Sequence, residues 1–183
     1  MNFIRKLQVP MRATGAFIAL AGWFLLTFAQ AFESSLPGAA ATAPARMRVW
    51  GFEVYDAKLW TRPGFAPAQY ARHPFALELH YLRGLKGDAI AQRSLDEMKR
   101  QGPINEPQAQ AWLQAMQALF PDVQKGDRIT GVHKPEQGAE FWVNGRMVGL
   151  VNDPQFAQLF FGIWLSPQTS APDVRKALLA QWP

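Results

Sequence analysis

Strict alternation of apolar and polar residues gives the clearest structural signal in this chain. Over residues 75–83, Phe75, Leu77, Leu79 and Tyr81 recur at every second position, which predicts a strand with one buried face. Residues 47–60 are rich in Val, Trp, Phe and Tyr and contain no proline. That composition predicts one or two more strands, with a turn near Gly51 or near Asp56.

Three further extended segments follow later in the sequence. Residues 127–133, 139–143 and 146–151 are rich in β-branched and aromatic side chains. Asn144-Gly145 separates the last two, and this dipeptide is the strongest short-range signal for a β-hairpin. We therefore expect these segments to form antiparallel neighbours.

Apolar residues at helical spacing predict four helices. The first extends from an Asp88 cap to about residue 101, and the second begins at Asn105. The third begins at Asp153 and is apolar on more than one side, so we expect it to be nearly surrounded by protein. Ser170 and Asp173 form the capping pair of the last helix. Runs of strands that alternate with runs of helices indicate an α+β fold with an antiparallel sheet.

Residues 1–31 have the pattern of a secretory signal peptide. Three basic residues precede an uncharged apolar run over residues 13–28, and Ala29-Gln30-Ala31 provides small residues before a cleavage point after Ala31. The alternative is an uncleaved membrane anchor, although the run is shorter than the roughly 20 residues that span a bilayer. We therefore expect export to the periplasm. Residues 32–45 are rich in Ala, Pro, Ser and Gly, which predicts a flexible lead-in to one domain over residues 46–183.

Removal of the leader changes the interpretation of the charge. The full chain has a net charge of +5, but three of its basic residues lie in the leader, so the remaining chain carries 16 basic and 14 acidic residues. The remaining cations are scattered, which argues against a nucleic-acid partner. Contact with a membrane is expected only through the leader, if the leader is not cleaved. The absence of cysteine excludes a lipid-modified cysteine and a thiol nucleophile.

Common catalytic motifs are missing from the sequence. It contains no glycine-rich phosphate loop, no Gly-x-Ser-x-Gly elbow and no His-Glu-x-x-His helix. Its three histidines are far apart and have no ligand partner at metal-binding spacing. We therefore predict neither a metal site nor a cofactor.

Two arginines in the first extended segment are candidates for ligand binding. Alternation would place Arg48, Trp50, Phe52 and Val54 on one face, and Val49, Glu53 and Tyr55 on the other. A guanidinium beside aromatic rings can hold a carboxylate or a phenolate at the end of an apolar pocket. The alternative is that these arginines reach into solvent at the edge of a sheet.

A second candidate lies where the alternating strand passes into the first helix. Tyr81 and Arg83 at the strand end, with the amides of the helix start, could stabilise an anion. The alternative is that these residues only complete the turn, because a cap at Asp88 would itself repel an anion.

Five segments, in this order, resemble the chalcone isomerase-like family, and in particular its exported bacterial branch. They are Val54-Tyr55-Asp56-Ala57-Lys58-Leu59-Trp60, Leu77-Glu78-Leu79-His80-Tyr81-Leu82-Arg83, Phe120-Pro121-Asp122-Val123-Gln124-Lys125-Gly126-Asp127-Arg128, Phe141-Trp142-Val143-Asn144-Gly145 and Phe160-Phe161-Gly162-Ile163-Trp164-Leu165-Ser166. The resemblance implies an open-faced β-sandwich, in which a large antiparallel sheet packs against a layer of helices with an apolar cleft between them. It covers about residues 46–181.

The resemblance also implies candidate site residues. In plant chalcone isomerases, a strand Arg and a following strand Thr act with a helical Tyr and Asn on a phenolate, whereas fatty-acid-binding members use Arg and Tyr to hold a carboxylate. The Arg corresponds to Arg46 or Arg48, and which of them faces the cleft is left open. The Thr corresponds to Tyr55.

The helical Tyr and Asn of the plant enzymes have no counterpart in this sequence. Their positions fall near Asp88 and near Ser94 or Leu95. Loss of such donors removes groups that each contribute orders of magnitude in rate, which argues against the plant reaction.

The leading hypothesis is an exported, non-catalytic domain that binds a small apolar or amphipathic molecule, such as a fatty acid. Arg46, Arg48, Tyr55, Tyr81 and Arg83 are its predicted ligand-binding residues. Two alternatives stay open. One is an isomerase or intramolecular lyase that acts on an unknown enone or phenolic substrate. The other is a structural or interaction module of the cell envelope, with an unknown protein partner, whose aromatic side chains fill the cleft.

Overall fold

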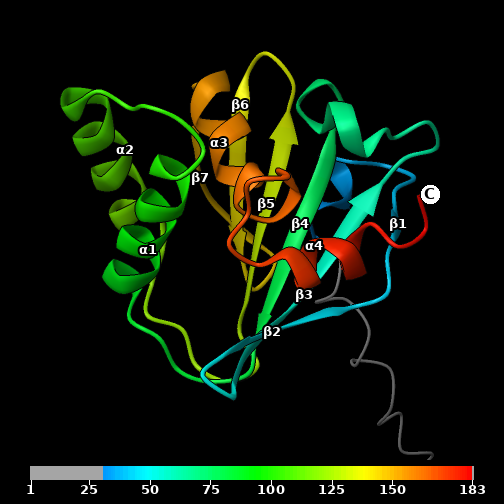
Figure 1. Ribbon diagram of the computed structural model, residues 1–183, viewed down its shortest axis with the longest axis horizontal. Coiled ribbons are helices and arrows are strands. Elements are labelled where there is room, and N and C mark those ends of the chain that lie inside the picture. The colour runs from blue at the N-terminus through cyan, green and yellow to red at the C-terminus, as the bar shows by residue number, and fades with distance from the viewer. Residues whose placement is uncertain (1–30, 183) are drawn as a thin grey trace, which may run out of the picture.

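A large antiparallel sheet, with helices packed on one face, forms the framework of the computed structural model. The structure describes residues 31–182, and Figure 1 shows the arrangement. The sheet has seven strands in the order β1-β3-β4-β5-β6-β7, and β2 pairs with β3 on the same side as β1. The α+β fold predicted from the sequence is confirmed.

The main strands and helices agree closely with the sequence pattern, whereas β1 and the two 3-10 helices lie where it predicted no regular structure. The strands are β1 (Ala40–Ala41), β2 (Ala45–Val49), β3 (Phe52–Thr61), β4 (Phe75–Tyr81), β5 (Arg128–Lys134), β6 (Gly138–Val143) and β7 (Arg146–Val151). The helices are α1 (Gly87–Lys99), α2 (Glu106–Leu119), α3 (Pro154–Leu165) and α4 (Pro172–Leu178), with 3-10 helices η1 (Ala31–Ser34) and η2 (Pro67–Arg72). Of the described helices, none is long and apolar enough to cross a membrane.

One face of the sheet, called here the inner face, is covered by the helices. Leu79 on the central strand β4 pairs with Ala57 on β3 and with Ile129 on β5. Residues paired across strands point to the same face, so these three side chains lie together on the inner face. Phe75, Leu77, Leu79 and Tyr81 are all buried there, which confirms the alternation predicted for β4.

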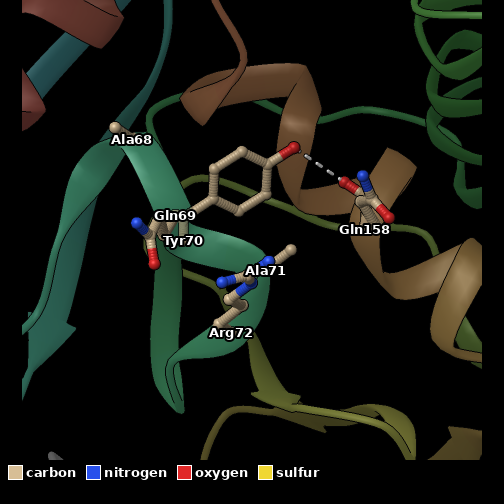
Figure 2. Close-up of a pocket in the computed structure, with 6 residues that line it drawn as sticks. All are labelled: Ala68, Gln69, Tyr70, Ala71, Arg72 and Gln158. Atoms are coloured by element: carbon tan, nitrogen blue, oxygen red, sulfur yellow. Dashed lines mark hydrogen bonds between the residues drawn. The ribbon is translucent and has the colours of Figure 1, made fainter.

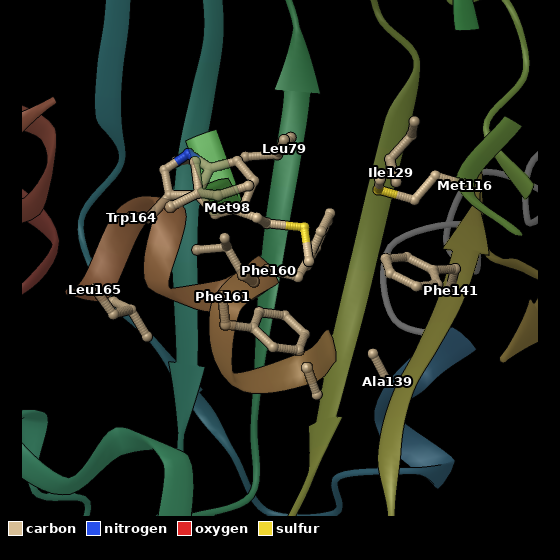
Figure 3. Close-up of a cluster of buried hydrophobic side chains, with 14 of the residues drawn as sticks. Leu79, Met98, Met116, Ile129, Ala139, Phe141, Phe160, Phe161, Trp164 and Leu165 are labelled. Atoms are coloured by element: carbon tan, nitrogen blue, oxygen red, sulfur yellow. The ribbon is translucent and has the colours of Figure 1, made fainter. Parts of the chain in front are cut away.

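Helix α3 lies across the inner face and supplies more aromatic side chains to the core than any other element. Phe156, Phe160, Phe161 and Trp164 are all buried, and Figure 3 shows Phe160, Phe161 and Trp164 lying against the strands. The Phe161 ring meets the Phe75 ring edge-on, with centroids 4.9 Å apart. The prediction that this helix is nearly surrounded is therefore confirmed, and the layer between sheet and helices is tightly filled.

The N-terminal segment packs on the opposite, outer face of the sheet. Its composition predicts a flexible lead-in over residues 32–45, whereas the structure buries Phe32 and Leu36 against Ala76 and Val132. The Phe32 ring meets the Trp60 ring edge-on at 5.4 Å. The two apolar side chains Phe32 and Leu36 therefore attach this Ala-, Pro-, Ser- and Gly-rich segment to the sheet. Residues 1–30, which contain almost all of the predicted signal peptide, lie outside the described residues.

Two helix caps agree with the sequence and two do not. Asn105 and Asp153 accept hydrogen bonds from backbone amides of the first turns of α2 and α3, as expected. Asp88, in contrast, lies inside α1, which begins after Lys86 without a side-chain cap from its own chain segment. Ser170 does not cap α4 either, because that helix begins after Ala171.

A residue distant in sequence caps α1 instead. The Asp122 carboxylate accepts the Gly87 N–H at 3.0 Å and contacts the Lys86 ammonium at 2.6 Å. Gly87 permits this approach, because a Cβ there would lie 2.1 Å from the Phe120 carbonyl oxygen. The helix start that could have received an external anion therefore already holds a carboxylate of the same chain.

The first extended segment is a hairpin. The chain reverses at Trp50-Gly51, so Val49 pairs with Phe52 and Arg48 pairs with Glu53. The sequence left open a turn near Gly51 or near Asp56, and the structure selects Gly51. The predicted common face of Arg48, Trp50, Phe52 and Val54 is wrong, because alternation along one strand does not continue through a turn.

Candidate functional site

Arg46 and Arg48 lie on the outer face, away from the helices. Arg46 pairs across the ladder with Asp56, which alternates with the inward-facing Tyr55 and Ala57. Its guanidinium holds the Asp56 carboxylate through two bonds, from Nε at 2.8 Å and from Nη2 at 2.9 Å. The prediction that these arginines line a cleft between sheet and helices is therefore corrected: strand alternation directs them to the other side.

The carboxylates on that face already occupy both guanidinium groups. Glu53 accepts a hydrogen bond from Arg46 at 2.8 Å and another from Arg48 at 2.9 Å. Hydrogen bonding to Arg46 lowers the pKa of Glu53 and also that of Asp56. An incoming carboxylate would have to displace these partners, so this cluster is a poor receptor for a ligand.

Tyr55 and Tyr81, in contrast, face the helices and lie next to each other. They are direct neighbours across β3 and β4, and their rings meet edge-on with centroids 6.0 Å apart. The indole Nε1 of Trp164 on α3 donates a hydrogen bond to the Tyr55 hydroxyl at 2.9 Å. The sequence predicted both tyrosines as ligand-binding residues, and the structure places both in the layer between sheet and helices.

Helix α1 adds two charged groups near the Tyr55 hydroxyl. The Glu97 side chain is only 6% exposed and forms ion pairs with Arg93 and Arg100. The charges of Glu97 and Arg93 both act on the Tyr55 hydroxyl, in opposite directions. We define the inner polar cluster as Tyr55, Tyr81, Trp164, Arg93 and Glu97.

Sequence reasoning missed three of these five residues. Trp164 is part of the apolar pattern of its helix, and that pattern predicts only a core position. Arg93 and Glu97 form an ordinary i,i+4 pair on a helix, which usually lies on a solvated surface. Only the packing of α1 and α3 onto the sheet brings these groups to the tyrosines.

Both tyrosines are neutral hydrogen-bond donors at physiological pH. Burial raises the pKa of Tyr55 to about 12, although the hydrogen bond from Trp164 opposes this shift. Burial also raises the pKa of Tyr81, and the neighbouring Tyr55 adds to that shift. A general base should have a pKa near the working pH, so the two phenols are suited to bind and orient a polar group rather than to remove a proton.

The remaining predicted residue, Arg83, does not join this cluster. Its guanidinium carbon lies 5.2 Å from the centroid of the Phe52 ring, at the turn between β2 and β3. The strand ends at Tyr81, so the alternation that would have placed Arg83 beside Tyr81 is interrupted. The anion site predicted from the pair Tyr81 and Arg83 is therefore not formed.

The positions that correspond to the plant catalytic Tyr and Asn offer no hydrogen-bond donor directed at the inner polar cluster. Asp88 is exposed on α1, and Leu95 belongs to the hydrophobic core. The Ser94 hydroxyl donates to the Ile90 carbonyl of its own helix at 2.8 Å. None of the three supplies a free group toward the inner polar cluster.

The histidines have structural surroundings. His133 is buried, stacks on Phe75 with ring centroids 4.9 Å apart, and its Nδ1 lies 2.9 Å from the His73 carbonyl oxygen. Burial lowers the pKa of His133 and favours the neutral ring. Within residues 31–182, no group of three His, Asp or Glu side chains could hold a metal ion.

Two shallow hollows lie outside the layer between sheet and helices. The larger, about 280 Å³, is bordered by η2 and by Gln158 of α3, where the Tyr70 hydroxyl donates to the Gln158 carbonyl at 3.1 Å (Figure 2). The smaller, about 190 Å³, lies at the turn between β5 and β6 and beside β7. Neither adjoins Tyr55 or Tyr81, whose surroundings are filled by side chains.

Comparisons with known proteins relate this fold to one family. Residues 36–180 match the sequence profile of the chalcone isomerase-like family. An uncharacterized protein of Haemophilus influenzae is 30% identical over 133 residues, which make up 72% of this chain and 64% of the relative. This chain thus spans less than two thirds of the relative's length.

A solved structure shows the same architecture. The crystal structure of a fatty-acid binding protein of Arabidopsis thaliana superposes with a TM-score of 0.58, covering 77% of this chain and 85% of that one. The two sequences are 11% identical, so this likeness concerns the fold alone. Because the profile match spans most of the chain and the sheet and helices follow the same architecture, this chain belongs to the chalcone isomerase-like family.

Proposed function

We propose that this protein is an exported, non-catalytic binding domain for a small amphipathic molecule, such as a fatty acid. The ligand lies between the sheet and helix α3, with its polar end at the inner polar cluster. A fold shared with a fatty-acid binding protein supports this class of ligand. Export rests on the pattern of residues 1–31 and predicts a mature N-terminus at Phe32, which mass spectrometry of the periplasmic protein would detect.

The hydrogen bond between Trp164 and Tyr55 is the observation that carries the proposal. It places two polar groups on the inner side of the sheet, in a layer otherwise filled with aliphatic and aromatic side chains. The Tyr55 oxygen accepts in this bond, so its own proton is available for an acceptor such as a carboxylate. The charge of Arg93 acts on the same hydroxyl, and because Arg93 is ion-paired with Glu97, a bound carboxylate would share this cation with Glu97.

The filled interior requires the layer to open when a ligand enters. Pockets for small molecules usually measure about 300–1,000 Å³, and the aromatic side chains of α3 occupy the space beside the cluster. A bound acyl chain must therefore displace rings such as Phe160 and replace their apolar contacts. We expect ligand binding to change tryptophan fluorescence and to raise the melting temperature.

Two tyrosine substitutions form a matched test of the site. Tyr55→Phe and Tyr70→Phe each remove one hydroxyl that takes part in one hydrogen bond, but only Tyr55 belongs to the inner polar cluster. Titration with oleate should give a dissociation constant about tenfold or more higher for Tyr55→Phe, the size of a lost hydrogen bond to a charged group. Tyr70→Phe should bind like the wild type.

Methyl oleate separates the acyl chain from the carboxylate. It should bind the wild type and Tyr55→Phe equally, because the ester lacks the charged acceptor. If neither lipid binds, the proposed function is wrong. If Tyr70→Phe weakens oleate binding instead, the ligand occupies the hollow beside η2 and the assignment to Tyr55 is overturned.

A second function is favoured by the closed interior. A domain whose cleft is filled by Phe and Trp side chains can act as an interaction module of the envelope without a ligand. In that case a panel of acyl and phenolic compounds should leave the melting temperature unchanged. Isomerase or lyase activity has less support, because both inner tyrosines are held neutral by burial.

A further inference from the structure

The turn between β2 and β3 has a residue that its backbone geometry disfavours. Trp50 and Gly51 have φ values of 50° and 81°, and the turn between β6 and β7 repeats this geometry with Asn144 at 48° and Gly145 at 80°. Asparagine and glycine are the residues such turns prefer, because they tolerate the left-handed region. A tryptophan in the first position is therefore not explained by the needs of the turn.

Trp50 gains no compensation from packing. It is 94% exposed, and Val49 and Phe52 beside it are 40% and 62% exposed. We call Val49, Trp50 and Phe52 the aromatic tip. The aromatic tip thus exposes apolar surface to solvent at one end of the sheet, where it makes no packing contribution to the folded chain.

A cation lies directly against the aromatic tip. The Arg83 guanidinium lies over the Phe52 ring, whereas Arg48, next to Val49 in sequence, is held by Glu53. The loops nearby share this end of the sheet, because the Leu82 N–H donates to the Val54 carbonyl and the Gly126 N–H donates to the Tyr81 carbonyl, both at 2.9 Å. Figure 1 shows the β2–β3 turn beside these loops.

The balance of charge at this end is positive. Most acidic side chains here already have cationic partners: Glu53 contacts Arg46 and Arg48, Asp56 contacts Arg46, and Asp122 contacts Lys86. Asp127 accepts from the neutral Asn144 side chain and keeps its negative charge. Across the described residues, no carboxylate lies within ion-pair distance of Arg83, Lys125 or Arg146, which are all exposed. These three cations are therefore available to an external anionic surface.

We propose that the aromatic tip inserts into the interface of an anionic phospholipid bilayer. Tryptophan prefers the boundary between headgroups and acyl chains, where the ring is buried and the indole N–H stays hydrated. Arginines around it reach the phosphate groups and gain from the negative surface potential. This contact is separate from the predicted signal peptide and goes beyond the proposed ligand site, from which it is distinct in position and chemistry.

A bilayer fits the aromatic tip better than a protein partner does. A stable protein interface covers about 800 Å² on each side and needs a complementary surface of that extent. The aromatic tip consists of Trp50 on a two-residue turn and the flanking Val49 and Phe52, with the Arg83 guanidinium against the Phe52 ring. A fluid surface needs no matching shape, so a small exposed apolar turn with a basic neighbour is enough to bind it.

Vesicle binding tests this proposal directly. The full chain is mixed with vesicles of phosphatidylethanolamine and phosphatidylglycerol, or of phosphatidylcholine alone, and the bound fraction is measured by sedimentation. We expect preference for the anionic vesicles, about a tenfold or greater loss of affinity in Trp50→Asn, and about a fivefold loss in Arg83→Gln. Leu150→Asn is the matched control, because Leu150 is 55% exposed on β7 but lies away from the aromatic tip.

Quenching by brominated lipids provides a readout that other segments cannot imitate. All variants share residues 1–31, so any binding through the apolar leader is equal among them. The part of the quenched fluorescence that is lost in Trp50→Asn reports insertion of Trp50 itself. No such loss, or equal binding of Trp50→Asn and wild type, would overturn the proposal. Unchanged vesicle binding together with lost self-association in Trp50→Asn would assign the aromatic tip to a protein contact instead.

Discussion

Replacement of Trp50 by asparagine should make the protein more stable, although it replaces a large apolar residue by a small polar one. The left-handed conformation costs an ordinary residue roughly 1–2 kcal/mol, and asparagine tolerates it better. The Trp50 side chain is 94% exposed, so its removal sacrifices almost no buried area. We expect a gain of about 0.5–1 kcal/mol in the free energy of unfolding, because the new residue relieves only part of the strain.

The reverse substitution, Asn144→Trp in the β6–β7 hairpin, should lower the free energy of unfolding, and by a larger amount. Asn144 accepts the Arg128 N–H at 2.8 Å and donates to Asp127 at 2.9 Å, so Asn144→Trp loses two hydrogen bonds and also introduces strain. Each hydrogen bond contributes about 1 kcal/mol, which gives a loss of about 3 kcal/mol in total. The pair of variants thus compares the same turn with and without side-chain partners.

Urea denaturation and thermal melting would measure both variants. A gain of this size in Trp50→Asn should raise the melting temperature by about 1–4 °C for a chain of this length. If Trp50→Asn were less stable than the wild type, the indole would have to contribute to folding, and the inference that its role is external would fail. A stable variant is also what the vesicle experiment requires, because loss of binding could not then result from unfolding.

Two further predictions concern α1 and the buried histidine. Asp122→Ala should lower the melting temperature by about 2–4 °C, whereas Asp88→Ala should change it little, because Asp122 and not Asp88 caps the helix; equal effects would refute this assignment. Stability should fall as the pH drops below 6.5, since burial lowers the pKa of His133 and the unfolded chain takes up the proton first. Urea titrations across about pH 7 to pH 5 should show a weaker pH dependence in His133→Gln, and an unchanged slope would contradict this cause.

The two proposed lipid contacts, at the inner polar cluster and at the aromatic tip, differ in how accessible they are in the folded protein. The inner polar cluster lies under helices and requires the aromatic layer to open, whereas the aromatic tip is exposed without any movement. Tyr55→Phe and Trp50→Asn therefore separate them: the first should affect oleate binding only, and the second should affect vesicle binding only. A domain with both properties could take up an amphipathic molecule while it rests on a membrane.

Local patterns predicted the elements correctly wherever the signal and its physical cause lie close together in the sequence. The Asn144-Gly145 hairpin, the Asp153 cap of α3 and the buried alternation of β4 all depend on residues a few positions apart. The mistaken cap at Asp88 shows the opposite case. Its replacement, Asp122, is distant in the sequence, and no local pattern connects the two.

The composition of the candidate site depended on contacts between residues that are far apart in the sequence. The sequence singled out Tyr55 and Tyr81 but grouped them with Arg46 and Arg48, because residue types alone do not fix on which side of a sheet a side chain lies. The turn at Trp50-Gly51 and the shift of register near Met47 decided this, and they sent both arginines to the outer face. Trp164, Arg93 and Glu97 joined the tyrosines only through the packing of helices onto the sheet.

The sequence by itself thus determined the fold class, the order of the main strands and helices, and the two tyrosines of the inner face. Hydrophobic periodicity and turn chemistry are local and act within a few residues, so they can be read along the chain. The tertiary structure alone decided which charges meet which carboxylates, how full the layer between sheet and helices is, and that Trp50 points into solvent. These depend on contacts between residues far apart in sequence, where burial and register determine which groups meet.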